Sequence, residues 1–149
     1  MALPPGYSIS SDRARIDVDA VHAYLARAYW SPGVPRDVVA RAIAHSLCVG
    51  LFLGEEQVGF ARAVTDRATF AYLADVYVLE AHRGRGLGKA LIAALMAHED
   101  LQGLRRMLLA TRDAHALYGG FGFGPLADAS RMMEIVRTEP YGSLAGGSR

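Results

Sequence analysis

The sequence predicts a mixed α/β domain in which a largely antiparallel sheet is flanked by helices. Apolar periodicity alternates between the helical and the extended type along the 149 residues. Hydrophobic residues make up 52% and charged residues 21%, which excludes a disordered chain. The expected element order is β-α-α-β-β-β-α-β-α-β-β, with one strand–helix–strand unit at its centre. A chain of this length predicts a single domain over residues 1–149, with its core at about 7–136.

The first third of the chain predicts one strand and two helices. An extended segment covers Tyr7–Ile16, and Asp17 follows it. The Asp17 carboxylate can accept hydrogen bonds from the free N–H groups of a first helical turn, so we expect it to cap a helix. Apolar residues recur on one face of that helix at Val18, Val21, Leu25 and Ala28. A loop containing glycine and proline, 31–35, separates it from a second helix at Arg36–His45.

The middle of the chain predicts three strands. Two of them, Leu47–Leu53 and Gln57–Thr65, surround the turn 54–56 and form a hairpin. The third, Phe70–Leu79, is longer and almost continuously apolar. Such a run is typical of a central strand that is covered on both faces.

The last part of the chain predicts alternating helices and strands. A helix is expected from Gly86 to about Glu99, followed by a strand at 106–110. Asp113 can cap a short helix that ends at Tyr118. The segments 121–123 and 132–136 are interpreted as final strands, and the glycines after Tyr141 predict a flexible tail at 141–149.

Composition and charge exclude several classes of function. Lysines and arginines number 16 and acidic residues 15, so the formal net charge of +1 gives nucleic-acid binding little support. The one cysteine, Cys48, lies in an apolar run and is expected to be a buried side chain rather than a catalytic thiol. No metal is expected, because the histidines lack ligand spacing and a multi-cysteine zinc site needs more cysteines. No secretory or membrane-spanning segment is visible, so the expectation is a cytoplasmic protein without a membrane partner.

A glycine-rich turn joins the long strand to the following helix. Glycines there allow positive φ angles and a close approach of a ligand to the backbone. The helix start presents unpaired N–H groups and a partial positive charge, which together bind an anion such as a phosphate. Lys89 follows the turn and adds to the charge of its arginines. The turn reads Arg83-Gly84-Arg85-Gly86-Leu87-Gly88.

Two common phosphate-binding patterns do not fit this turn. A Walker A motif requires glycine and serine or threonine where Arg83 and Ala90 stand. A dinucleotide motif of the G-x-G-x-x-G type requires its third glycine one residue later than Gly88. A plain strand-to-helix turn with solvated arginines is the simpler interpretation, but three alternating glycines beside cations favour a phosphate site.

The turn resembles the R/Q-x-x-G-x-G/A motif of the GNAT N-acetyltransferase superfamily. The preceding Asp75–Leu79 is similar to that family's fourth strand, and Tyr118–Phe123 is similar to its Y-x-x-F-G-F segment. The element order agrees as well, so the resemblance covers about Tyr7 to Val136. It implies the GNAT fold, in which two central strands splay apart.

The resemblance implies acetyl-CoA as cosubstrate and no metal. Its pyrophosphate would lie on the amides of the glycine turn, and its pantetheine arm would run along the long strand as a pseudo-strand. The backbone N–H of Val78 is the expected donor to the acetyl carbonyl. The residues expected to bind acetyl-CoA are Tyr77, Val78, Arg83, Gly84, Arg85, Gly86, Leu87, Gly88 and Lys89.

Tyr118 and Asp75 are the candidate catalytic residues. Tyr118 matches the family tyrosine whose hydroxyl lies near the sulfur. A free tyrosine has a pKa of about 10 and a free thiol about 8.5, so full proton transfer to the thiolate is uphill by about 2 kcal/mol. We therefore expect Tyr118 to act by hydrogen bonding, although it could also be a packing aromatic. Asp75 could deprotonate the incoming amine through water, or form an ion pair with an arginine.

The acceptor site of such enzymes is built by the first helices and their connecting loop, where Tyr29 and Trp30 lie here. These aromatic residues could bind substrate or close the core. The function that follows is acetyl transfer from acetyl-CoA to a primary amine of an unidentified small molecule or peptide. A noncatalytic acyl-CoA-binding or sensing domain and a nucleotide-phosphate enzyme are the alternatives. The resemblance also allows a homodimer.

Overall fold

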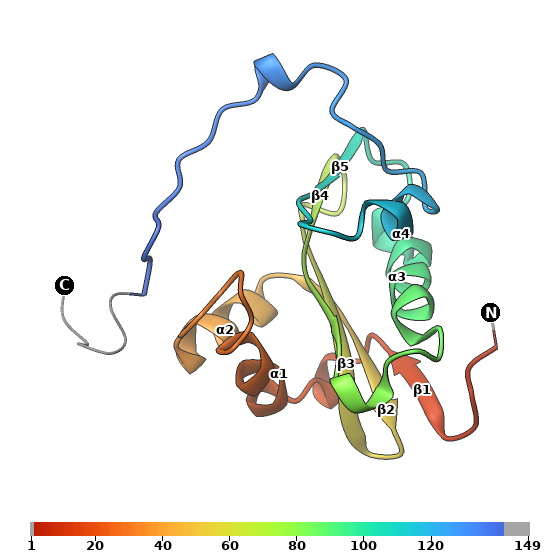
Figure 1. Cartoon of the computed structure of the whole chain (residues 1–149). Coiled ribbons are helices and arrows are strands. Elements are labelled where there is room, and N and C mark those ends of the chain that lie inside the picture. Colours follow the sequence, from red (N-terminus) through yellow and green to blue (C-terminus); the bar gives the residue numbers. More distant parts are fainter. Residues whose placement is uncertain (1, 142–149) are drawn as a thin grey trace.

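The computed structural model describes residues 2–141 and shows a mixed five-stranded sheet between two layers of helices (Figure 1). The strands lie side by side in the order in which they occur along the chain. The first four are antiparallel, whereas β4 and β5 are parallel. This arrangement confirms the predicted fold class. The strands are β1 (Tyr7–Ser10), β2 (Leu47–Leu53), β3 (Glu56–Thr65), β4 (Phe70–Val78) and β5 (Arg106–Leu109).

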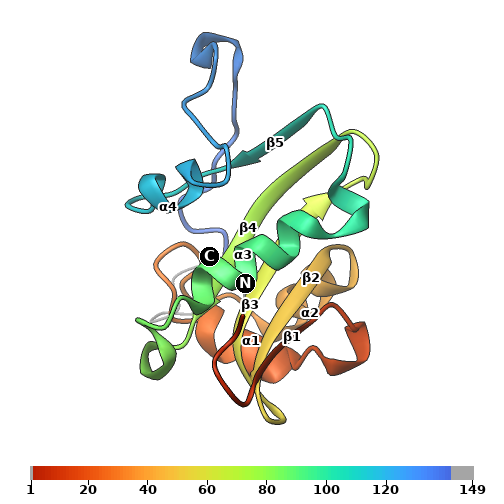
Figure 2. The ribbon, with the colours of Figure 1, turned by 90° about the vertical axis from the view of Figure 1, so that its right-hand side faces the viewer.

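The helices separate onto the two faces of the sheet. Two of them, α1 (Val18–Leu25) and α2 (Arg36–Ala44), cover one face (Figures 1 and 2). The helix α3 (Leu87–Ala97) covers the other face, and α4 (His115–Gly119) lies on the same side of the sheet as α3. Asp17 caps α1 as expected, with its side chain 3.0 Å from the Ala20 N–H. Single 3₁₀ turns occur at η1 (Arg13–Arg15), η2 (Glu80–His82), η3 (Glu99–Leu101) and η4 (Ala129–Arg131).

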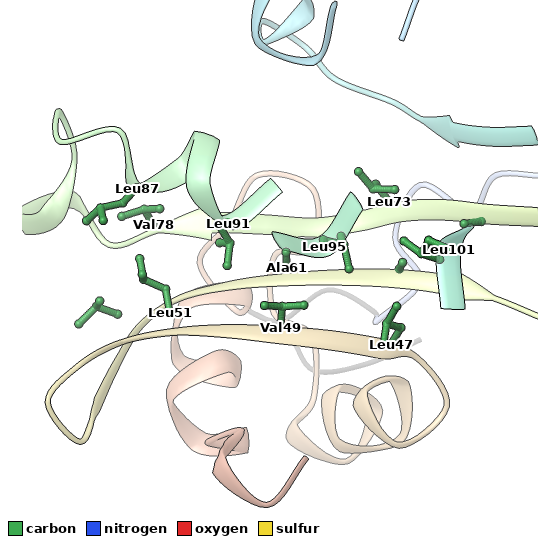
Figure 3. Close-up of a cluster of buried hydrophobic side chains, with 13 residues drawn as sticks. Leu47, Val49, Leu51, Ala61, Leu73, Val78, Leu87, Leu91, Leu95 and Leu101 are labelled. Carbon is green, nitrogen blue, oxygen red and sulfur yellow. The ribbon is translucent and has the colours of Figure 1, made fainter. Parts of the chain in front are cut away.

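The larger core lies between α3 and the sheet. Leu87, Leu91 and Leu95 are spaced four residues apart and point from α3 toward the strands (Figure 3). They meet Val49 and Leu51 of β2 among a cluster of buried aliphatic side chains. Burial of each leucine contributes about 2 kcal/mol, so this face holds α3, and with it the preceding turn, in a fixed position.

The end of the chain departs most from the sequence prediction. The predicted strand at 121–123 is wrong, because these N–H groups close turns on α4: Phe121 and Phe123 both donate to the Tyr118 carbonyl. The predicted strand at 132–136 is also wrong, since no described strand pairs with it. Asp113 does not cap α4: the residue before the helix is Ala114, and no side chain caps the first turn. The Ala114 N–H instead donates a hydrogen bond to Thr111 Oγ1. The predicted flexible tail lies outside the described residues except for Tyr141.

Two further predictions need correction. The first strand ends at Ser10 rather than Ile16, because the chain turns at Asp12 into η1. β4 is not covered on both faces along its whole length: Phe70 and Tyr72 are exposed, while Ala71 and Leu73 are buried. The helices α1 and α2 do not extend over this end of the sheet. Within residues 2–141, no helix is long and apolar enough to cross a membrane.

Candidate functional site

The parallel strands β4 and β5 pair only along the first half of β4. Their pairing begins at Phe70 and Arg106 and stops at Leu73 and Leu109. β4 continues to Val78, so its last residues present an edge that β5 does not pair with. The second half of β4 therefore lacks a partner on this side, as expected for a splay, but its neighbour β5 is the edge strand of the described sheet and not a central one.

The register of β3 and β4 determines which backbone groups face this opening. The Leu79 N–H bonds to the Val58 carbonyl on β3 at 2.9 Å. Backbone groups alternate in direction along a strand, so Val76 and Val78 direct theirs away from β3 and into the opening. Tyr77 directs its carbonyl toward β3, where a side chain at Gly59 would lie 3.0 Å from it. Val76 and Val78 thus have backbone groups that face the opening, whereas the Tyr77 side chain belongs to the core.

The glycine turn presents free amides at the start of α3. Gly84 and Gly86 have φ angles of +82° and +75°, which a residue with a side chain rarely adopts. Ala90 is the first residue of α3 whose N–H bonds back to the turn, at the Gly86 carbonyl. In the described chain, none of the N–H groups of residues 84–89 donates to a protein acceptor. Six consecutive unpaired donors at the start of a helix are suited to a phosphate or pyrophosphate.

Three cations surround these amides. Arg83 donates to the Val78 carbonyl and to the Tyr24 hydroxyl, at 2.9 Å in both cases. Arg85 donates to the Tyr7 hydroxyl at 2.9 Å, and Lys89 is exposed. None of the three forms an ion pair with a carboxylate of residues 2–141. Their charge is therefore available to an anionic ligand.

A cavity of about 600 Å³ lies on the α1–α2 side of the sheet and reaches β4 where the splay begins. Its wall is rich in aromatic side chains. Asp75 and Val76 line it, so the cavity reaches β4 beside the part of its edge that β5 leaves unpaired. The aromatic residues that line it are Tyr29, Trp30, Phe60, Tyr72, Tyr118 and Tyr141.

Both carboxylate oxygens of Asp75 are engaged by neighbours. Arg62 Nε donates to Oδ2 and Trp30 Nε1 donates to Oδ1, each at 2.8 Å. Arg62 also donates to Ser46 Oγ at 3.0 Å. Asp75 is only 7% exposed, and the side chain of Arg62 is 16% exposed. The carboxylate thus belongs to a buried ion pair that fixes one wall of the cavity, and the ion-pair interpretation of Asp75 describes what the structure contains.

Tyr118 lies on α4 with its ring against Phe123, at a centroid distance of 6.0 Å. Its side chain is half-buried and lines the cavity, and its hydroxyl has no hydrogen-bond partner among the described residues. Burial, with a smaller contribution from the Tyr29 phenol, raises the pKa of Tyr118 above its usual value. The phenol is therefore protonated at neutral pH and available as a hydrogen-bond donor.

Tyr29 and Trp30 lie where the sequence predicts an acceptor site. Their rings meet edge to face at 5.1 Å, and the Arg112 guanidinium lies 3.8 Å from the Tyr29 ring centroid. Sequence reasoning missed Arg62 and Arg112 as parts of this site. A signal for Arg62 was available, because a charged residue inside an apolar strand needs a partner and Asp75 lies in the next strand. Among residues 2–141, no group of three His, Cys, Asp or Glu side chains could hold a metal ion.

Comparison with known proteins yields one family. The sequence profile of the acetyltransferase (GNAT) family matches residues 17–123. A Gibberella zeae protein named for acetyltransferase activity is 36% identical, with 76% of each chain covered. A crystal structure of a GNAT-family protein from Xanthomonas campestris pv. campestris is 47% identical, with a TM-score of 0.91 over 95% of this chain and 100% of the other. The Escherichia coli ribosomal-protein-S18-alanine N-acetyltransferase shares the fold, with a TM-score of 0.64 at 24% identity over 79% of this chain and 77% of its own.

Proposed function

We propose, from the premise that this chain belongs to the acetyltransferase (GNAT) family, that it transfers an acetyl group from acetyl-CoA to a primary amine by direct attack. The observation that supports this best is the combination of the unpaired N–H groups of residues 84–89 with the edge of β4 that β5 leaves unpaired beyond Leu73. A ligand with a diphosphate at one end and an amide-bearing chain at the other matches both parts. The acceptor is a small molecule or a peptide that enters the aromatic cavity.

The binding part of the proposal assigns each portion of acetyl-CoA to a group of residues. The diphosphate lies on the amides of residues 84–89, with Arg83, Arg85 and Lys89 supplying charge. The pantetheine arm pairs with the backbone of Val76 and Val78 as an added strand. Neither contact needs a particular side chain on β4, which fits the apolar character of this strand.

The chemical part uses few groups of the chain. The amine nitrogen forms a bond to the thioester carbonyl carbon, the carbon–sulfur bond breaks, and the sulfur leaves with the electron pair. The Val78 N–H polarises the carbonyl. The protonated Tyr118 donates a hydrogen bond to the departing sulfur. The amine loses one proton when it becomes an amide, and the CoA thiolate takes up one proton to become the free thiol. Asp75 acts as a positioning residue, since its oxygens hold Trp30 and Arg62 in the cavity wall.

The shape of the cavity supports an acceptor with an apolar or aromatic body. Trp30 and Tyr72 provide aromatic rings that pack against carbon and attract a cationic amine before it loses its proton, whereas Arg112 already lies over the Tyr29 ring. The two carboxylates in the wall differ in availability, because Asp75 is paired and Asp113 is exposed. Aromatic and peptide-terminal amines therefore rank first among acceptors to test.

The test is a screen of amines with acetyl-CoA that measures release of the CoA thiol and acetylation of the amine by mass spectrometry. Amino acids, peptide N-termini, polyamines and aminoglycosides form the panel, and omission of the amine measures background hydrolysis. Transfer to at least one amine, reduced in Tyr118→Phe, is expected. Tight binding of acetyl-CoA without transfer to any amine would overturn the proposal in favour of a sensing domain. Preference for ATP or NAD over CoA would overturn the assignment of the ligand.

A further inference from the structure

Two charged side chains are buried together in the wall of the aromatic cavity. Arg62 of β3 and Asp75 of β4 both line this cavity, and Arg62 Nε donates to Asp75 Oδ2 at 2.8 Å. Their side chains are only 16% and 9% exposed. A buried ion pair contributes little net stability, because removing two charges from water offsets most of their attraction. Its position against a cavity is therefore suited to the recognition of a ligand.

The hydrogen bonds within this pair leave part of Arg62 free. Its Nε donates to Asp75, and its Nη1 donates to Ser46 Oγ. Both hydrogens of Nη2 and one of Nη1 have no acceptor among residues 2–141. No described side chain has a fully buried nitrogen or oxygen without a partner, so Nη2 is accessible, and Arg62 lines the cavity. Arg62 can therefore donate to an oxygen atom of a molecule bound there.

Asp75 has free capacity of the opposite kind. Each of its oxygens accepts one hydrogen bond, from Trp30 or from Arg62, although a carboxylate oxygen has two lone pairs. The ion pair thus presents a donor and an acceptor side by side, and its charges cancel. Arg112 and Asp113, which also line the cavity, are exposed and opposite in sign. A neutral carbonyl beside an N–H donor matches such a site, whereas a carboxylate would add an uncompensated charge in a largely buried place.

The ion pair lies next to the edge of β4 along which the proposed pantetheine arm runs. Asp75 directly precedes Val76, whose backbone faces this edge, and successive residues of a strand are about 3.3 Å apart. Tyr118, the proposed donor to the leaving sulfur, lines the same cavity. An amine that attacks a thioester on this edge therefore lies close to Asp75. A carbonyl group that reaches Arg62 at the same time has to be attached to the carbon that carries the amine.

The remainder of the cavity accommodates an apolar group. Phe60 of β3 and Val39 and Ile43 of α2 are buried and line it. Its volume of about 600 Å³ is in the range of pockets that hold small molecules. A phenyl ring or a branched aliphatic side chain would be removed from water there, which favours binding. The cavity thus suits a compound in which an amine, a carbonyl group and an apolar side chain share one carbon.

We propose that Arg62 determines the acceptor specificity, and that it selects neutral α-amino carbonyl compounds with an apolar side chain. The amide of phenylalanine is the simplest example, and a peptide that begins with phenylalanine presents the same groups. Arg62 donates to the carbonyl oxygen, while Asp75 accepts from the amine and holds Arg62 in place. This inference rests on the proposed function, because it names the acceptor of that reaction, and the bonds that form and break are the same. Binding is measured in its test, so acetyl transfer does not have to occur.

The first test compares three ligands by calorimetric titration of the full-length protein with excess CoA present, which cannot transfer an acetyl group. At about pH 6 all three amines are protonated. Phenylalaninamide carries the neutral carbonyl, phenethylamine lacks it, and phenylalanine carries a carboxylate instead. Phenylalaninamide should bind about 10-fold more tightly than phenethylamine, the contribution of one hydrogen bond to a charged donor, and more tightly than phenylalanine. Equal affinities for phenylalaninamide and phenethylamine, no saturable binding of phenylalaninamide, or tighter binding of phenylalanine would overturn the proposal.

The second test assigns this preference to Arg62. Arg62→Lys keeps a positive charge beside Asp75 but loses the planar set of N–H donors. The preference for phenylalaninamide over phenethylamine should fall from about 10-fold to about twofold or less, whereas purely structural damage would weaken both ligands alike. Arg41→Lys makes the same change at an exposed residue of α2 that does not line the cavity, and should retain the preference. An unchanged preference in Arg62→Lys would overturn the proposal, and the ligand comparison on the wild-type protein remains decisive if this variant does not fold.

Failure of the inference and failure of the proposed function give different results. If the preference for phenylalaninamide is present and depends on Arg62, but mass spectrometry detects no acetylation of this ligand with acetyl-CoA, the recognition by Arg62 stands and the proposed reaction fails. If amines without a neighbouring carbonyl are acetylated as well as phenylalaninamide is, and no preference in binding is found, the proposed reaction stands and the role of Arg62 is overturned.

Discussion

Replacing Gly86 by aspartate tests the anion site at its most sensitive point. The residue precedes α3 with a φ of +75°, and a Cβ atom there would meet nothing within 4 Å. The variant therefore introduces backbone strain and a negative charge without a clash inside the protein. The strain of a side chain in this conformation costs about 1 kcal/mol of stability, which a domain of this size tolerates.

The effect on acetyl-CoA binding is larger and has a different origin. Two unit charges 4 Å apart repel by about 1 kcal/mol even in water. Repulsion from two phosphate charges then amounts to about 2 kcal/mol, or about 30-fold in the dissociation constant. Screening by Arg83 and Lys89 reduces this value, whereas exclusion of water on binding increases it. An effect of at least 10-fold is therefore expected.

Calorimetric titration with acetyl-CoA measures the effect, and two controls isolate its cause. Gly86→Asn has nearly the same shape and conformational preference as Gly86→Asp without the charge, so the difference between them reports the repulsion. Gly103→Asp introduces the same residue at a φ of +74° with similarly open surroundings, away from the turn. It should lose similar stability in urea unfolding and retain full affinity. Equal affinities for Gly86→Asp and Gly86→Asn, with both folded, would refute the assignment of the turn as the diphosphate site.

Three further outcomes are expected. Tyr118→Phe should lower kcat by about 10-fold or more with little change in the KM for acetyl-CoA, because it removes one hydrogen bond to the leaving sulfur. The pKa of Tyr118 is raised, so its phenol stays protonated and the wild-type rate should fall only above about pH 10. This alkaline decline should be absent in Tyr118→Phe. Asp75→Ala leaves the buried Arg62 unpaired and should destabilise the fold by about 3 kcal/mol in urea unfolding, and the double variant with Arg62→Met should lose less than the sum of the two single losses. Burial raises the pKa of the Cys48 thiol to about 11, so this thiol should react with thiol reagents only after the protein unfolds. As the pH rises, the thiol ionises at a lower pH in the unfolded chain than in the folded one. Its contribution to stability is therefore complete below about pH 9 and is lost as the pH rises to about 11, and Cys48→Ala should remove this loss.

The elements with strong local signals could be predicted from sequence. The apolar spacing of α3, the Asp17 cap of α1 and the hairpin of β2 and β3 each depend on neighbours within one or two turns of chain. The ends of β1 and of the chain could not be predicted in the same way. Phe121 and Phe123 alternate like strand residues, but their N–H groups close turns on the Tyr118 carbonyl instead. Local alternation cannot show which acceptor a backbone donor will find.

The candidate site likewise has one part that could be predicted from the sequence and one part that could not. The glycine turn is recognisable because its chemistry lies in consecutive residues. The Asp75–Arg62 pair depends on a shift in strand register: Ala61 pairs with Val76 but Ala63 pairs with Leu73, so two residues of β4 lie opposite Arg62. Such a bulge redirects a side chain, and nothing in the sequence shows where it falls. The sequence therefore indicates only that each of these two charged residues needs a partner, and not that they pair with each other.

The strand predicted at 132–136 illustrates the same limit. The prediction is wrong for the described chain, because the segment has no neighbouring strand to pair with. An apolar pattern predicts an extended segment but does not state which backbone groups it will pair with, so the four apolar side chains of this segment are exposed instead of packed on a sheet.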